Sequence, residues 1–573
     1  MTGAADFLGL VARAQMRTAA GGWAEAAALW AEVTERNPVN GDYWARLAEA
    51  RFANEEYAAA RQAYQKVLEL GLRATYLHRL RDSQPELIPG EVAYRIACCA
   101  AALGHRDEAI DALAAALDRG FRDLDRARTD EYWTPWHADE RLRDLLGMID
   151  AAGLTRDEGW RFDLRFLARE IKRRGYAPFA IISEAEFDRR VAALHRDVPG
   201  LTDAQLWAGM LKLVRHLDDG HAGILPPKDD KDMMRMLPLD LFAFPEGPFV
   251  IAAGPGCEHL VGARVERIGR RTVEEAVAAL DPVIVRDNHQ QVTFMNAMFL
   301  RRTALLHALG ITDDPGQATL TLGLPDGTSR ETTLTAVPGK SLWDHYPQGW
   351  TALTDTVPGR PCPLHLRNRE LPYWFEYLPD ADLVYFQYNG VCDHPAETFA
   401  AFCDRLFCFI SARRSARLAV DMRWNGGGDT FLAQPLLHHL VACREINRPG
   451  ALFVIIGRLT YSAAQTTATA IDRETNAIFV GEPTGSRPNF IGEQLRFELP
   501  YSKFRANVAD LFWQTSWPWD HRSWIAPDIY APPTFESFSR NEDPALQAIL
   551  AIREHPPPQA ANLARPRGAG SSS

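Results

Sequence analysis

The chain has 573 residues, 46% of them hydrophobic and 24% charged. This composition is that of a folded globular protein and excludes disordered, collagen-like and integral membrane classes. The formal net charge of −11 provides no basic field for a phosphate backbone, so we expect no nucleic-acid partner. No run approaches the ~18 consecutive apolar residues of a membrane span, so we expect no membrane partner either. At ~150 residues per domain, the length predicts three or four domains.

Cysteine usage and the N-terminal residues indicate a cytoplasmic protein, and the absence of two motifs indicates a protein without cofactors. The eight cysteines are sparse and none forms a C-x-x-C pair, which favours reduced thiols. The first twenty residues lack the basic start and continuous apolar run of a secretory signal. No H-E-x-x-H or G-x-x-x-x-G-K-[ST] motif is present, so we expect neither a metal nor a nucleotide cofactor.

Residues 1–150 predict helical repeats. The segment GWAEAAALWAEV at 22–33 recurs as EYAAARQAYQKV at 56–67, and a weaker copy, HRDEAIDALAAAL, lies at 105–117. Trp23 and Tyr57 occupy matching positions 34 residues apart, which is the tetratricopeptide period. Such stacks need about three units and offer a concave surface, so we expect a protein partner here. A plain helical bundle is the alternative.

The next two regions differ in their apolar period. Residues 151–235 keep a helical period, as in WRFDLRFLAREI and AQLWAGMLKLVRHL. Residues 236–340 show short β-like runs between Gly and Pro turns, such as FVIAA, ARVERIG and ATLTLGL, with one helix-like stretch, VEEAVAAL. This second pattern predicts a small β-rich domain similar to a PDZ module.

Residues 341–552 predict an α/β core. The strand-like runs LVYFQYNG, LAVDMRW, LFVIIG and AIFVGE alternate with helix-like segments, which indicates βαβ units and a largely parallel sheet. The tail 553–573 has neither pattern, and we expect it to be disordered. The predicted fold class is therefore multidomain α plus α/β.

Two segments of this core lie at the carboxyl ends of strands, where α/β sheets place active sites. Gly426, Gly427 and Gly428 follow the strand LAV, and glycines there let backbone N–H groups face a ligand. Ser462 follows LFVIIG at the start of a helix, where serine is a favoured cap and where free N–H groups surround its hydroxyl. Together they predict a nucleophile with an oxyanion hole made by the amides of Ala463 and of Gly426 or Gly427.

A serine nucleophile needs a base within hydrogen-bond reach. Only seven residues of the chain are lysines, and the one that follows Lys340 is Lys503, in a loop-like segment 41 residues past Ser462. A lysine base is therefore poorly supported. His221, in HLDDGHAG, lies in a turn-rich break after a helix and is the better candidate, although a histidine in a turn is more often simply exposed.

These residues carry a family resemblance. VDMRWNGGGDT, TYSAA and FVGEPTGSRPN occur in the order and at about the separations found in the C-terminal-processing, or tail-specific, serine peptidases. The upstream DDGHAG resembles the histidine loop of the branch that includes the tricorn core protease. The resemblance covers about residues 150–545 and implies a crotonase-like core and a peptide or protein substrate.

The resemblance also implies roles for matching residues. Ser462 falls at the nucleophile and His221 at the general base. The catalytic lysine of the dyad branch is replaced by Arg487, whose guanidinium cannot accept a proton. The serine that precedes the histidine in the tricorn core is Gly220 here, so one auxiliary contact is expected to be missing.

The third catalytic residue is left open. The tricorn-like branch has a glutamate that orients the histidine, and Asp520 is the closest acidic match, with Glu482 and Glu493 as rivals. Four tryptophans surround Asp520, and because large aromatics usually close a core, we expect core packing rather than a substrate cleft. These are Trp513, Trp517, Trp519 and Trp524.

The sequence thus predicts a serine peptidase that works through an acyl-enzyme. The alternative is a catalytically inactive binding or scaffold protein that keeps the peptidase fold.

Overall fold

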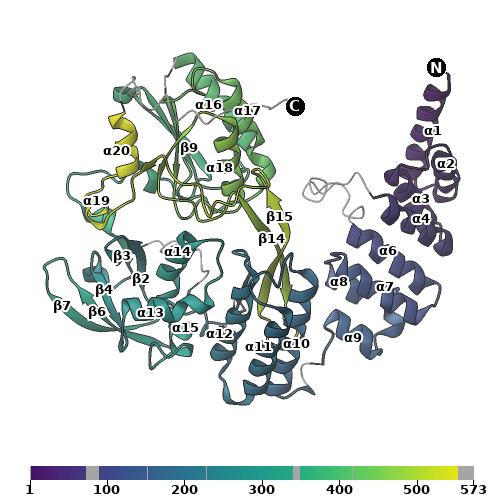
Figure 1. Cartoon of the computed structure of the whole chain (residues 1–573), viewed down its shortest axis with the longest axis horizontal. Helices are drawn as coiled ribbons and strands as arrows, with labels where there is room; N and C mark the ends of the chain where they lie inside the picture. The colour runs from purple at the N-terminus through teal and green to yellow at the C-terminus, as the bar shows by residue number, and fades with distance from the viewer. Residues whose placement is uncertain are drawn as a thin grey trace, which may run out of the picture. The chain divides into compact units, whose positions relative to one another are not determined.

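The computed structural model describes residues 2–71, 89–150, 153–227, 229–339, 349–413, 415 and 417–552. These residues divide into two compact units, Met1–Arg174 with Leu499–Ser502, and the remainder, and each is described by itself (Figure 1). The predicted mixture of a helical region with sheet-containing regions is confirmed. The tail 553–573 lies outside the described residues.

The first unit consists of helices that pack on their neighbours in chain order. Helices α2 and α4 begin at Trp23 and Tyr57, so the 34-residue spacing coincides with helix starts. Ala26 and Ala60 are fully buried, because a small side chain lets neighbouring helices approach closely. The helices are α1 Thr2–Ala19, α2 Trp23–Arg36, α3 Gly41–Ala53, α4 Tyr57–Leu70, α6 Pro89–Ala102, α7 Arg106–Asp118, α8 Leu124–Thr129, α9 Glu140–Leu146 and α10 Arg156–Arg174.

The predicted helical piece 151–235 does not form one unit. Helix α10 belongs to the first unit because Asp163 accepts hydrogen bonds from the amides of Tyr501 and Ser502, both at 2.8 Å. Gly159 of α10 leaves room for the Tyr501 ring, which a Cβ would approach to 2.3 Å. The helices α11 (Glu184–Asp197) and α12 (Asp203–Val214) belong to the second unit instead.

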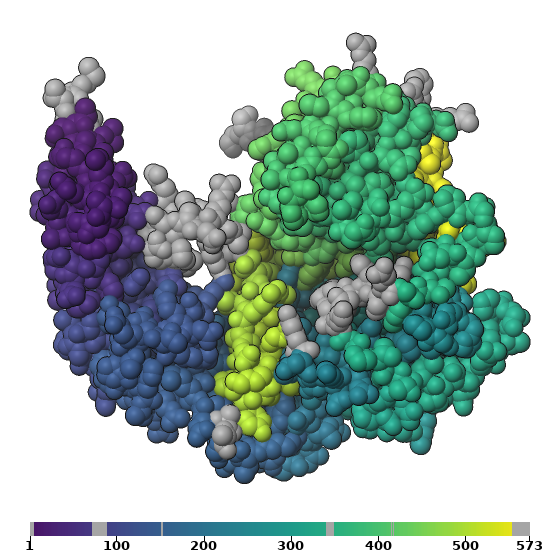
Figure 2. Space-filling model, turned by 180° about the vertical axis from the view of Figure 1, so that it is seen from behind, coloured from purple at the N-terminus to yellow at the C-terminus, as the bar shows by residue number. Residues whose placement is uncertain are grey.

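A three-stranded antiparallel sheet in the second unit has the order β1-β15-β14. Strand β1 (Gly223–Leu225) directly follows the His221 turn, and β14 (Asn489–Glu498) and β15 (Arg505–Gln514) form a long hairpin. Figure 2 shows the hairpin as a yellow-green stripe on one face of the molecule. The Trp207 indole of α12 donates to the Ile224 carbonyl at 2.8 Å, which fixes α12 on β1.

The β-rich region forms a separate antiparallel sheet with the order β2-β3-β4-β6-β7, to which β5 and β8 add at β4 and β3. Strand β8 pairs with β3, so this sheet includes residues past the predicted boundary at 340. Its strands are β2 Leu239–Phe244, β3 Gly247–Ala253, β4 Arg264–Ile268, β5 Arg271–Thr272, β6 Gln317–Gly323, β7 Ser329–Thr335 and β8 Thr351–Ala352. The helices of this region are α13 Val273–Leu280, α14 His289–Phe299 and α15 Thr303–Ala308.

The predicted α/β core is a six-stranded sheet of order β16-β13-β12-β11-β10-β9, parallel except at β9. Its strands are β9 Tyr373–Leu378, β10 Leu383–Tyr388, β11 Arg417–Asp421, β12 Leu452–Ile456, β13 Ile478–Gly481 and β16 Ile529–Tyr530. Its helices are α16 Phe399–Arg413, α17 Gln434–Ala442, α18 Ala463–Glu474, α19 Phe535–Phe538 and α20 Pro544–Ala551.

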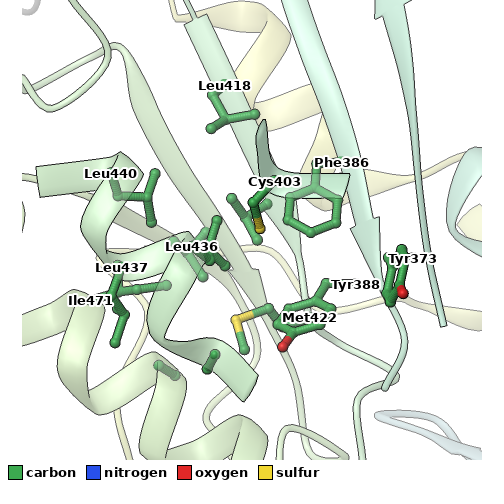
Figure 3. Packing of buried hydrophobic residues seen from close by; sticks show 14 of the residues in the cluster. Tyr373, Phe386, Tyr388, Cys403, Leu418, Met422, Leu436, Leu437, Leu440 and Ile471 are labelled. Carbon is green, nitrogen blue, oxygen red and sulfur yellow. The ribbon is translucent and has the colours of Figure 1, made fainter. Parts of the chain in front are cut away.

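Alternate residues of these strands fill two cores. Val384 and Phe386 of β10 pack with residues of α16, α17 and α18, as Figure 3 shows for part of this cluster. Leu383 and Tyr385 point to the other face and pack with α20. Because both faces are covered, the central strands are fully buried and their carboxyl ends form a fixed edge.

All eight cysteines are free thiols, of which Cys98, Cys99 and Cys403 are buried. Among the described residues, no helix is both long and apolar enough to cross a bilayer.

Candidate active site

Ser462 occupies the sharp turn between β12 and α18. Its φ of 54° and ψ of −125° are unusual for a residue with a Cβ, and such a conformation costs of order 1–3 kcal/mol. Its side chain makes no capping hydrogen bond to α18. Ser462 therefore occupies the N-cap position of α18 without capping it through its side chain, and its hydroxyl remains available for chemistry.

The glycine loop packs directly against this turn. A Cβ on Gly427 would lie 2.7 Å from the Cβ of Ser462 and 2.9 Å from the amide nitrogen of Ala463, so only glycine fits there. The amide of Gly427 donates to Asn425 Oδ1 at 3.0 Å and is already occupied. Among the described residues, the amides of Gly426 and Ala463 have no hydrogen-bond partner. The two predicted oxyanion donors that remain free are thus Gly426 and Ala463.

His221 lies in a turn that two aspartates hold in place. The guanidinium of Arg487 donates two hydrogen bonds to the Asp218 carboxylate, at 2.6 and 2.9 Å. Asp219 accepts from the His221 amide and from the Ala509 amide of β15, both at 2.7 Å. The arginine at the position of the dyad lysine is therefore an anchor of the histidine turn, and its ion pair with Asp218 raises the pKa of Arg487.

Gly220 explains the missing serine of the tricorn pattern. A Cβ at Gly220 would lie 2.6 Å from both Asp287 Oδ1 and Gln291 Oε1, so a larger residue does not fit. The Gly220 amide donates to Asp287 Oδ1 at 2.9 Å, and Gln291 Nε2 donates to the Gly220 carbonyl at 2.9 Å. Asp287 also accepts a hydrogen bond from the Ser486 hydroxyl. These groups occupy the space that a serine side chain would need.

Both buried aspartates near the histidine are weak acids. Burial raises the pKa of Asp219 to about 7, against the lowering effect of the Ala509 amide. Burial likewise raises the pKa of Asp287 to about 6, against its hydrogen bond from Ser486. Near neutral pH, a fraction of each carboxyl is therefore protonated.

The His221 ring is buried between aromatic side chains. Its Nδ1 is hydrogen-bonded to the Tyr461 hydroxyl at 2.8 Å, and the rings of Tyr461 and Phe490 stack on it with centroid distances of 4.5 and 5.5 Å. Burial lowers the pKa of His221 to about 4, against the raising effect of the Ile491 carbonyl. Among the described residues, Nε2 has no hydrogen-bond partner, and none joins the ring to Ser462.

Asp520, the closest acidic match, makes no hydrogen bond to His221 among the described residues. Asp520 accepts from Ser516 Oγ at 2.6 Å and from Arg522 Nη2 at 2.8 Å, and the Arg522 hydrogen bond lowers the pKa of Asp520 to about 2. Asp520 follows β15 in a loop whose partners are local, and the resemblance could not show this.

The rival acids do not bond to the ring either. Glu482 is paired with Arg458 and lines a small pocket with His365 at the carboxyl ends of β12 and β13. Glu493 has a φ of 71° at an irregularity of β14, where Gly492 and Gln494 pair with Leu511 and Ala509.

The tryptophan-rich segment does not close a core, contrary to the prediction. Trp517 and Trp519 are 55% and 72% exposed and stack on each other with a centroid distance of 5.7 Å. Trp513 and Trp524 are half-buried. Trp513 lies within β15, whereas Trp517 and Trp519 lie past its end, outside the sheet.

Sequence reasoning missed three residues around the histidine. Tyr461 belongs to the TYSAA motif, but a tyrosine next to a nucleophile has no fixed role, so the motif indicates Ser462 alone. Asp287 and Gln291 belong to no motif and reach the turn only through the fold. Among the described residues, no group of three or more His, Cys, Asp or Glu side chains is arranged to hold a metal ion.

No family model matches the chain. No curated protein matches it either. Among solved structures, mature CPAF aligns with 69% of this chain and 96% of its own length at 14% identity and a TM-score of 0.48. The photosystem II D1 C-terminal processing protease (69% and 97%) and the tricorn protease (69% and 36%) each align at 14% identity and a TM-score of 0.34. The kinds of peptidase that the motifs resemble thus recur among the structural neighbours, although scores this low assign no activity to this chain.

Proposed function

We propose that this protein is a serine-type peptidase with Ser462 as nucleophile and His221 as general base. The observation that carries the proposal is the strained turn at Ser462, which presents an unbonded hydroxyl beside the free amides of Gly426 and Ala463. A strained residue is retained where the surrounding structure holds it for function. The motif resemblance supports the same reaction.

The proposed reaction begins when His221 Nε2 takes the Ser462 proton as Oγ attacks a peptide carbonyl. The amides of Gly426 and Ala463 donate to the oxyanion, which stabilises the tetrahedral intermediate. His221 then returns the proton to the leaving amine, and an acyl-enzyme remains on Ser462. A water molecule, deprotonated by the same Nε2, releases the acyl group.

The hydrogen bond between Ser462 and His221 forms in this proposal when substrate binds, because catalytic contacts are often long in unliganded enzymes. The Nε2 of His221 has no hydrogen-bond partner among the described residues and is therefore available for this contact.

A fluorophosphonate probe tests the proposal. The wild-type protein is expected to be labelled and Ser462→Ala is not. Ser415→Ala is the matched control, since Ser415 Oγ also has no hydrogen bond among the described residues and lies outside the site. Undiminished labelling of Ser462→Ala would refute the assignment of the nucleophile.

The second candidate is a non-catalytic binding protein that keeps this fold. The unmade contact between Ser462 and His221 favours it. A wild-type protein that is not labelled, and in which peptide binding leaves the His221 Nε2 more than ~5 Å from the Ser462 hydroxyl, would support binding over hydrolysis.

We also propose a domain type for each of three regions: the N-terminal helices, the antiparallel β-rich region and the parallel sheet. The helix starts at Trp23 and Tyr57 support tetratricopeptide-like repeats that dock a protein partner or substrate. The antiparallel sheet with α13 supports a PDZ-like domain, and the covered parallel sheet supports a crotonase-like core.

A further inference from the structure

Tyr461, the residue before the candidate nucleophile, contacts the candidate base. Its hydroxyl lies 2.8 Å from His221 Nδ1, and its ring stacks on the imidazole with an interplanar angle of 27°. In serine hydrolases the group bonded to Nδ1 orients the histidine and selects its tautomer. Here that position is occupied by a phenol.

We propose that Tyr461 is the positioning residue of this site: its oxygen accepts the Nδ1 proton of His221 and so keeps Nε2 unprotonated as the base. This inference rests on the proposed peptidase function. None of the acids predicted from sequence orients the His221 ring, because no hydrogen bond joins the ring to Asp520, Glu482 or Glu493.

The position of Nε2 supports this assignment independently. His221 is only 7% exposed, and its Nε2 has no partner among the described residues. A buried polar nitrogen without a partner is costly and rare, and it is expected where a substrate or nucleophile completes the contact. Nδ1 thus makes the orienting hydrogen bond, and Nε2 is the nitrogen that acts as the base.

The surroundings suit a neutral orienting group. Burial, together with the charges of Asp287 and Asp219, raises the pKa of the Tyr461 phenol well above its usual range, so it stays protonated. A phenol oxygen can accept the Nδ1 proton while its own hydrogen is donated elsewhere.

Each group that faces the pair can be identified. The histidine turn presents Asp219, the segment before α14 presents Asp287, and α14 presents Gln291, whose side chain is hydrogen-bonded to Tyr461. Strand β14 presents the Phe490 ring and the Ile491 carbonyl. The Phe490 ring restricts rotation of the imidazole. The tyrosine can therefore fix both the tilt and the tautomer of the base.

The substitution Tyr461→Phe removes one oxygen and keeps the stacking ring. Tyr388→Phe is the matched control, since Tyr388 lies in the core beside Met422 (Figure 3) and its hydroxyl has no hydrogen bond among the described residues. We expect the rate of fluorophosphonate labelling to fall at least about tenfold in Tyr461→Phe, with the final labelled fraction unchanged. Tyr388→Phe is expected to label at the wild-type rate.

A second readout does not depend on activity. In protein labelled with ¹⁵N at histidine only, long-range ¹H–¹⁵N spectra report the tautomer of each ring, and His221→Gln identifies the signal of His221. Wild type is expected to show the Nδ1–H form, and Tyr461→Phe a mixture of both forms. A purely packing role for the tyrosine would leave the tautomer unchanged.

The outcomes separate the two proposals. Two results would overturn the positioning role: a wild-type His221 in the Nε2–H form, or faster labelling of Tyr461→Phe. Either would show that the tyrosine hinders His221 from acting as the base. If no form of the protein is labelled but the tautomer changes as expected, the orienting contact is established and the peptidase proposal is what fails.

Discussion

The serine half and the histidine half of the candidate site are held by different physical means. The turn at Ser462 is fixed by backbone geometry: it follows a buried parallel strand, and a glycine loop from the neighbouring strand packs against it at a distance that excludes a Cβ. The turn at His221 is fixed by side chains far apart in the sequence, among them Arg487 and Asp287.

The two halves should therefore respond differently to substitution. Backbone packing tolerates almost no added volume, so a single methyl group disrupts the serine half. The histidine half has several parallel tethers, so the loss of one weakens it by degrees. The three predictions below probe this contrast, from the largest expected effect to the smallest.

Gly427→Ala is expected to slow fluorophosphonate labelling at least about 100-fold, because the new Cβ would meet the Cβ of Ser462 at 2.7 Å and displace the nucleophile. Gly450→Ala is the matched control: its φ of +81° imposes similar backbone strain, but a Cβ there meets nothing within 4 Å. If both variants are labelled at the wild-type rate, the glycine loop does not place the serine.

Asp218→Asn is expected to slow labelling about tenfold, since it weakens the pair with Arg487 but leaves the other tethers of the histidine turn. Asp520→Asn is its counterpart, because Asp520 also accepts an arginine, Arg522, through more than one hydrogen bond. We expect Asp520→Asn to change the rate less than threefold. A larger loss for Asp520→Asn than for Asp218→Asn would restore Asp520 as the third catalytic residue.

The pH dependence reports the burial of the histidine half. Burial lowers the pKa of His221 to about 4, so the neutral ring that acts as base is present above that value and is lost as the pH falls through it. Asp219 and Asp287 take up protons between about pH 7 and 6, and we expect only small changes of the labelling rate there, because the Arg487 pair still holds the turn. The main loss, to half the rate, is expected near pH 4, with tryptophan fluorescence confirming that the protein remains folded. A half-maximal rate near 6.5, the value of an exposed histidine, would contradict a buried base.

Much of the serine half follows from local patterns. The runs LVYFQYNG at 383–390, LAVDMRW at 418–424, LFVIIG at 452–457 and AIFVGE at 477–482 predict the central strands, and the structure has a strand within or overlapping each of them. In a parallel sheet the carboxyl ends of neighbouring strands share one edge, so the glycine loop and Ser462 were expected together. The apolar pattern does not predict the strained backbone of Ser462, which keeps its hydroxyl from capping α18.

The exposed tryptophans show the limit of composition. Large aromatics predict a core on average, but Trp517 and Trp519 lie past the end of β15, where no second layer covers them. Burial depends on what lies opposite a residue, and one sequence segment does not contain that information.

By itself, the sequence determined the strands, the glycine run, the serine turn and the rejection of a lysine base, since these depend on short-range periodicity and on which residue types are present. Only the tertiary structure decided what surrounds the histidine. Tyr461 contacts the His221 ring, and Asp287, Ala509 and Arg487 bind the turn around it, because the β12–α18 turn, the segment before α14, β15 and the loop after β13 converge there. Buried polar groups must find partners, and the partners are set by the packing of distant elements rather than by neighbours along the chain.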